Sequence, residues 1–72
     1  MTHDKFYYTI LVKTRKFGIE DMPQWLWNFD HGTNLSTGLV DIDVSEKSLS
    51  KVKRFFRMRK IPVKIIRRRV SE

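Results

Sequence analysis

Cationic side chains are the most concentrated chemical groups of this chain, and they gather in its last third. Residues 46–72 contain eleven Lys or Arg and two Glu, whereas residues 1–45 contain four basic and six acidic side chains. Lys supplies a mobile point charge and Arg a planar fork that matches two oxygen atoms, so both suit phosphate groups. No Asp or Glu lies between positions 47 and 69, which predicts one shared, uncompensated positive surface. The predicted phosphate-binding residues are Lys47, Lys51, Lys53, Arg54, Arg57, Lys60, Lys64, Arg67, Arg68 and Arg69.

The same cations could instead form a solvated surface that only keeps the protein in solution. Arg59 and Arg68 would then pair with carboxylates across the sheet. Surfaces of this ordinary kind usually mix both signs of charge, and the run from 47 to 69 does not. The lack of local acids therefore favours a surface that binds polyanions.

Two aromatic residues outside the expected core are candidates for stacking or for anchoring an interface. Trp27 lies opposite the apolar side of its expected helix, and Tyr7 lies on the outer face of the first expected strand. A ring beside cations can stack on an unpaired base or fill a partner's pocket. The alternative for Trp27 is packing against the 31–37 connection or beneath an Arg side chain. No motif for reading RNA bases or the DNA major groove is present, so we expect little sequence preference.

A weaker constellation consists of Asp30, His31, Asp41 and Asp43. Two carboxylates two residues apart on a strand share a face, and such groups hold metal ions in nucleases. Asp30 and His31 could also supply the acid–base groups of a small metal-independent ribonuclease. Cross-strand pairing of Asp41 and Asp43 with Lys64 and Arg68 is the more ordinary expectation. We therefore predict a non-enzymatic protein without catalytic residues, cofactor or metal site.

Composition indicates what kind of protein carries these groups. The chain has 72 residues, 40% apolar and 12% aromatic, so we expect one small core and a single basic domain over residues 1–72. Its net charge of +7 favours polyanionic partners. The lack of cysteine excludes disulfides and thiolate metal sites and fits a cytoplasmic protein. Neither a signal peptide nor an apolar stretch of membrane-spanning length is visible, so we expect no membrane span.

Hydrophobic periodicity and turn residues predict five elements. In chain order they are a strand over 5–14, a helix from Asp21 to about Asp30, a strand over 39–44, a helix that Ser45 caps and Pro62 ends, and a strand over 61–69. His31 and Gly32 are expected to end the first helix, and 33–37 to form a polar connection.

The same periodicities indicate which side chains face the core. In the first strand these are Phe6, Tyr8, Ile10 and Val12, and in the second Val40, Ile42 and Val44. The long helix should bury Leu49, Val52, Phe55 and Phe56. The last strand alternates Ile61, Val63 and Ile65 on one face with Lys64, Ile66 and Arg68 on the other.

The predicted order is therefore βαβαβ, which places the chain in the α/β or α+β class. Crossovers through helices favour neighbouring parallel strands, so we expect a three-stranded sheet with both helices on one face. An additional short strand within residues 31–38 would convert this into a split βαβ arrangement of the ferredoxin-like kind. Such an architecture implies no particular function.

We expect an intracellular module that binds the phosphates of DNA or RNA through the basic helix and the C-terminal strand. The alternative is a small regulator or inhibitor that docks on an acidic surface of a host protein, with Trp27 as its anchor. The small size and single-domain build are compatible with a phage-encoded protein. An exposed edge strand could also pair with a second copy of the chain.

Overall fold

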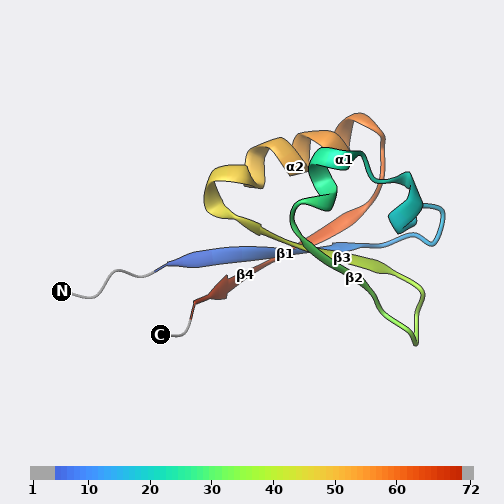
Figure 1. Ribbon diagram of the computed structural model, residues 1–72, viewed down its shortest axis with the longest axis horizontal. Coiled ribbons are helices and arrows are strands. Elements are labelled where there is room, and N and C mark those ends of the chain that lie inside the picture. The colour runs from blue at the N-terminus through green and yellow to red at the C-terminus, as the bar shows by residue number, and fades with distance from the viewer. Residues whose placement is uncertain (1–4, 71–72) are drawn as a thin grey trace.

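The computed structural model describes residues 5–70 and contains one sheet with both helices on the same face (Figure 1). The elements are β1 (Phe6–Val12), a 3₁₀ turn (Ile19–Asp21), α1 (Gln24–Trp27), β2 (Asp30–Thr33), β3 (Val40–Ser45), α2 (Glu46–Met58) and β4 (Val63–Arg69). The mixed α and β class and the placement of the helices are confirmed, and the sheet has four strands instead of three.

The strand order is β2-β3-β1-β4, and every neighbouring pair is antiparallel. β3 therefore lies between β1 and β2, while β1 lies between β3 and β4. This is the split βαβ arrangement that an additional strand within residues 31–38 would produce. The prediction of neighbouring parallel strands is wrong, because another strand is inserted between the two strands that each helical crossover joins.

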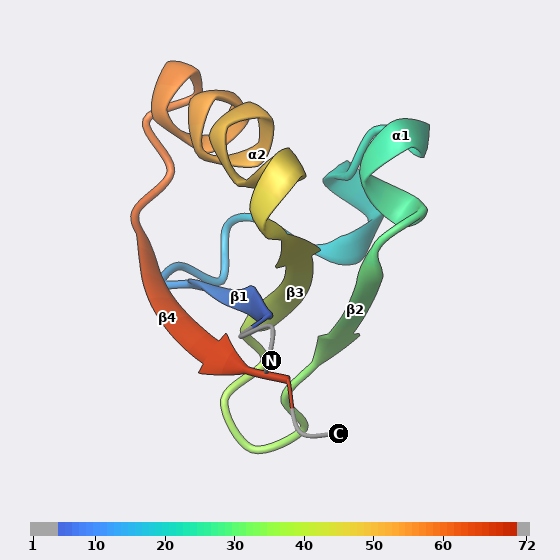
Figure 2. The same ribbon diagram turned by 90° about the vertical axis from the view of Figure 1, so that its left-hand side faces the viewer.

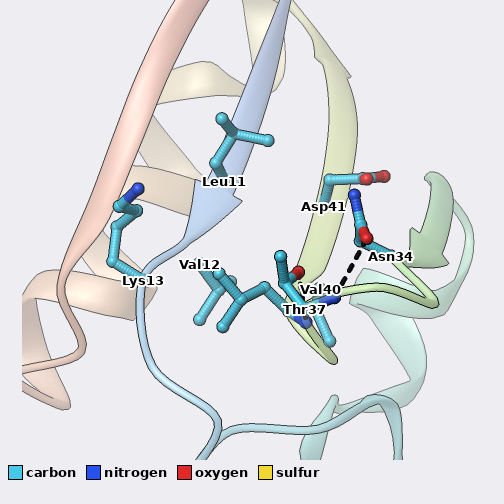
Figure 3. Close-up of a pocket in the computed structure, with 8 residues that line it drawn as sticks. Leu11, Val12, Lys13, Asn34, Thr37, Val40 and Asp41 are labelled. Carbon is cyan, nitrogen blue, oxygen red and sulfur yellow. Dashed lines mark hydrogen bonds between the residues drawn. The ribbon is translucent and has the colours of Figure 1, made fainter.

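The additional strand, β2, occupies residues that the sequence assigned to a helix stop and a polar connection. It forms a hairpin with β3, in which His31 lies opposite Ile42 and Thr33 opposite Val40. Asn34 closes the hairpin loop, because its side-chain Oδ1 accepts the backbone N–H of Ser36 at 2.8 Å and that of Thr37 at 3.1 Å. Figure 3 shows the bond to Thr37. This turn thus falls within the predicted polar connection, whereas the first residue of that connection, Thr33, belongs to the additional strand that was raised as an alternative.

The first helix is shorter than predicted, because it begins only after Pro23 and has a single turn. The carboxylate of Asp21, the expected cap, accepts the backbone N–H of Gly18 at 2.9 Å and so closes the preceding 3₁₀ turn. Met22 is extended, with ψ of 132°, as expected for a residue before proline. The chain can therefore enter α1 only at Gln24, and it enters β2 at Asp30 instead of continuing the helix.

The core lies between the two helices and the inner face of the sheet. Phe56 is fully buried, and its ring meets Phe17 edge to face at 5.3 Å and Phe55 at 5.1 Å. The predicted inward residues of β3 and α2 are confirmed, with Leu49 partly buried against the cluster. The buried residues are Ile10, Val12, Phe17, Met22, Leu26, Val40, Ile42, Val44, Val52, Phe55 and Phe56. These contacts hold α2 across the sheet.

The end of α2 has a Schellman geometry with a lysine where glycine is usual. The N–H of Ile61 donates to the carbonyl of Phe56 at 3.0 Å, and the N–H of Lys60 donates to that of Arg57 at 3.1 Å. Lys60 takes a φ of 57°, which is unfavourable for a residue with a Cβ. This turn redirects the chain into β4, so Pro62 follows the stop and does not itself end the helix.

Candidate nucleic-acid interface

The register of β4 against β1 divides the predicted phosphate-binding residues between two faces of the sheet. Val63 lies opposite Val12 and Ile65 opposite Ile10, so the odd-numbered residues of β4, including Arg67 and Arg69, face the helices. Lys64 and Arg68 face the other way, onto the side of the sheet that carries no helix in residues 5–70, called here the open face.

The prediction of one shared surface is therefore wrong for two of its ten residues. Lys64 and Arg68 lie on the open face, and the alternation of the strand was the signal that separates them from Arg67 and Arg69. The other eight are on α2, at its end or on the helix-facing side of β4, and we call them the cationic side. They are Lys47, Lys51, Lys53, Arg54, Arg57, Lys60, Arg67 and Arg69, and all eight are exposed.

The cations of α2 spread over three sides of the helix. Lys51 lies on the flank toward α1, where its Nζ is 4.5 Å from the centre of the Trp25 ring. Lys53 and Arg57, one turn apart, share the opposite flank, and Arg54 points away from the core. A polyanion that lies along α2 can therefore contact positive charge on either flank and on the top of the helix.

A shallow groove runs between α2 and β4 along the cationic side. Lys53 and Arg57 line it from the helix, and its apolar lining consists of Ile61, Val63 and Ile65. Figure 2 shows α2 above the half of the sheet that ends at the edge strand β4. The sequence identified the three apolar residues as core positions, but they are only partly buried and leave this groove beside the cations.

Several aromatic rings near the cations are already occupied by them. The guanidinium of Arg59 lies 4.1 Å from the centre of the Phe55 ring, and that of Arg67 lies 4.7 Å from the Phe6 ring. These contacts hold the charged groups against apolar surface while leaving them exposed. Leaving Arg69 aside, no cation of residues 5–70 lies within 4.0 Å of a carboxylate of that segment.

Carboxylates lie mainly in the other half of the sheet. Asp41 and Asp43 project from β3 onto the open face, and Asp30 on β2 lies directly opposite Asp43. The expected direct pairing of Asp41 and Asp43 with Lys64 and Arg68 is wrong, because β1 lies between their strands.

One residue of β1 connects these two sets of charges. Thr9 is 6% exposed, and its hydroxyl donates to Oδ1 of Asp43 at 2.6 Å. The hydroxyl oxygen of Thr9 also accepts Nε–H of Arg68 at 2.8 Å. A single threonine thus bridges the acidic and basic strands on the open face.

Trp27 belongs to α1 and contacts β2, the edge strand on the other side of the sheet from β4. The residue is 46% exposed. Its ring meets that of His31 in β2 edge to face at 4.8 Å, and its Nε1–H donates to the carbonyl of Met22 at 3.1 Å. β2 and β4 form opposite edges of the sheet. Trp27 therefore packs partly against the segment after α1, as the alternative predicted, whereas Tyr7 lies opposite Arg68 on the open face.

The residues considered for acid–base chemistry are separated by the sheet. His31 faces the helices opposite Ile42, and its Nδ1 lies 2.8 Å from the carbonyl oxygen of Phe29. Asp30 projects from the other face beside Asp43. Within the described residues, no three His, Asp or Glu side chains form a cluster suited to a metal ion.

The fold and the surface define a small split βαβ protein with its cations along one helix and one edge strand. Comparison of the chain with protein-family models, curated protein sequences and solved structures gives no significant match. Neither helix of the described segment has the length and apolar character needed to cross a bilayer.

Proposed function

We propose that this chain is a nucleic-acid-binding module that contacts phosphates through α2 and β4 with little sequence preference. The observation that carries the proposal is the sorting of charge: the eight residues of the cationic side are exposed, while Asp30, Asp41 and Asp43 lie on β2 and β3. From Lys47 onward, a phosphate backbone that follows α2 meets Lys and Arg, and the one carboxylate of this helix, Glu46, lies in its first turn. Binding would release condensed counterions, which supplies much of the affinity of such complexes.

The same surface accounts for the expected lack of sequence preference. Phosphate contacts position a protein on nucleic acid, whereas base contacts give specificity. The rings of Trp25, Phe55 and Phe6 lie beneath cations, and Trp27 is at the opposite edge of the sheet. The cationic side therefore offers charge to the backbone, without an exposed aromatic platform of its own for unpaired bases.

The test is a binding titration by fluorescence anisotropy over a series of salt concentrations, with oligonucleotides of unrelated sequence, both DNA and RNA. We expect log affinity to fall linearly with log salt, with a slope of about −0.9 per phosphate neutralised on a duplex. The variants Lys51→Ala, Arg54→Ala and Arg57→Ala should each weaken binding similarly on all sequences. Each should also reduce the magnitude of the salt slope by about one, because one phosphate contact is lost.

Arg15→Ala is the matched control, because it removes the same charge outside the cationic side. Its Nε–H donates to the carbonyl of Thr37 in the β2–β3 hairpin loop. We expect binding close to that of the unmodified chain. Equal losses for Arg15→Ala and Arg54→Ala would show that net charge alone governs binding and would contradict the proposal.

A second candidate function is that of a small regulator that docks on an acidic surface of another protein. The specific observation is the half-exposed ring of Trp27, which could anchor a protein interface. In a pull-down treated with nuclease, this function requires one stoichiometric protein that is lost with Trp27→Ala. Loss of all bound material on nuclease treatment would instead favour the nucleic-acid function.

A further inference from the structure

The outer side of β4 offers backbone groups in an extended arrangement. Lys13 N–H donates to the carbonyl of Pro62 at 2.8 Å, and Val70 N–H donates to that of Lys5 at 2.9 Å. In an antiparallel ladder the residues that bond to the neighbour alternate, so the even-numbered residues of β4 direct their backbone groups toward β1. Val63, Ile65 and Arg67 consequently direct their N–H and C=O groups outward, where no strand of residues 5–70 pairs with them.

The groove beside this edge extends the surface that an incoming strand would meet. The side chains of Val63 and Ile65 face the helices and form the floor of the groove, and Lys53 and Arg57 line its other side. On the open face the same edge presents Lys64. A strand added to β4 would therefore place alternate side chains over an apolar groove and beside cations.

These two sides define the chemistry of the partner. Residues over the groove should be apolar, and residues on the open face should be Asp or Glu, which is an alternating pattern at strand spacing. A second copy of β4 fits poorly, because its sequence Val63–Arg69 holds four cations that would meet four more. Nucleic acid can meet the cations, but it has no peptide backbone with which to continue the ladder.

We propose that the outer edge of β4 binds an extended segment of another protein, with apolar and acidic residues in alternation, as a fifth strand antiparallel to β4. The backbone of the segment exchanges hydrogen bonds with Val63, Ile65 and Arg67. Its apolar side chains cover Ile61, Val63 and Ile65, and its carboxylates lie near Lys64 and Arg68. Strand addition of this kind takes affinity from the backbone and selectivity from the alternate side chains.

The test uses the complete protein and a capped peptide of about eight residues in which Glu and Val alternate. Amide hydrogen exchange is followed by NMR, without and with the peptide. In the free protein the amides of Lys64 and Ile66 should be protected by β1, while those of Val63, Ile65 and Arg67 exchange quickly. At saturating peptide the three outward amides should become protected as well.

Two N-methylated peptides separate strand addition from simple charge attraction. In the antiparallel arrangement the Val residues direct their N–H groups toward β4, so methylating these nitrogens should weaken binding by about tenfold or more. Methylating the Glu nitrogens leaves the ladder intact and should change the affinity little. Both controls keep the four carboxylates of the peptide, so an electrostatic contact alone would bind all three peptides equally.

Three results would overturn this inference. They are equal affinities for the three peptides, continued fast exchange of the outward amides at saturation, and protection of these amides in the free protein with a concentration-dependent dimer. An oligonucleotide serves as a further comparison: it can shift the side chains of the cationic side but should leave the outward amides in fast exchange. Protection by the oligonucleotide equal to that by the peptide would also contradict strand addition.

Discussion

The two halves of the sheet differ in the charge that they carry, although the same core supports both. β2 and β3 carry Asp30, Asp41 and Asp43 and come after α1, which has no charged residue, whereas β4 carries four cations and comes after α2, which carries five more. The buried side chains of β1 and β3 belong to one core that supports both halves. Acidic and basic residues thus lie on different strands, while one core supports both halves of the sheet.

A small chain can place like charges together and still fold when the charged groups stay outside the core. The cations of α2 lie outside the helix stripe that meets the core, and Lys51 of the helix and Arg59 just after it rest on aromatic rings. Their charge remains in water, where repulsion is screened, while their stems cover apolar surface.

Phe56→Ala should remove most of the stability on which the cationic side depends. Phe56 is fully buried between Phe17, Phe55 and the sheet, and truncation of such a ring costs about 3–5 kcal/mol. In a small domain this loss is comparable with the whole free energy of unfolding. Urea denaturation followed by circular dichroism measures it.

The contrast is Trp27→Ala in the acidic half, where the ring is half exposed. We expect a loss of about 1 kcal/mol from the indole hydrogen bond and the edge contact with His31. Equal losses for the two substitutions would show that the core does not centre on α2.

Thr9→Val should uncouple the two charged halves where they meet. The substitution keeps the shape of the side chain but removes the hydroxyl that Asp43 and Arg68 share. We expect a loss of about 1 kcal/mol, since both partners can turn to water. Thermal unfolding compares this variant with Thr9→Ser, which keeps the hydroxyl and should lose less. Equal melting temperatures for the Val and Ser variants would show that the hydroxyl bridge does not contribute to stability.

Lys60→Gly should stabilise the protein, because it relieves the positive φ at the end of α2. The gain is about 0.5–1 kcal/mol, after allowing for the greater freedom of glycine in the unfolded chain. Lys60→Ala removes the same charge but keeps the Cβ, so it should give no such gain. If the two variants gained equally in chemical denaturation, charge repulsion and not backbone conformation would be the cause.

Asp30→Asn should give the smallest effect, a gain of about 0.3 kcal/mol. Asp30 lies directly opposite Asp43, and like charges in that position repel. The gain should fade in 1 M salt, where charges are screened over about 3 Å. A gain that persists in high salt would point to a cause other than repulsion.

The sequence predicted those parts of the fold that depend on local periodicity. The alternation of Val40, Ile42 and Val44 and the helical spacing of Val52, Phe55 and Phe56 place these residues correctly in the core. Each pattern is set by a single element that meets the core along one face. Such elements need no knowledge of their neighbours.

The parts that were not predicted depend on partners distant in the sequence. Asp30–Thr33 shows no apolar alternation, and its strand conformation comes from pairing with β3 through the Asn34 loop. Without that strand, the neighbours of β1 and their direction could not be assigned.

The candidate site shows the same division between local and distant information. Charge alone predicted correctly that the cations are exposed. It did not predict which of them share one side of the protein. Assigning Lys64 and Arg68 to the open face required only the alternation of β4, whereas the groove at Ile61, Val63 and Ile65 depends on where α2 lies above the sheet.

An NMR titration of the full chain with a short duplex of arbitrary sequence, at low and at physiological salt, tests whether nucleic acid binds the cationic side. Binding through the cationic side predicts that backbone and side-chain signals of α2 and of the helix-facing residues of β4 shift, and that signals of the β2–β3 hairpin do not. Shifts concentrated in the hairpin or around Asp41 and Asp43, or the absence of any shift at low salt, would contradict it.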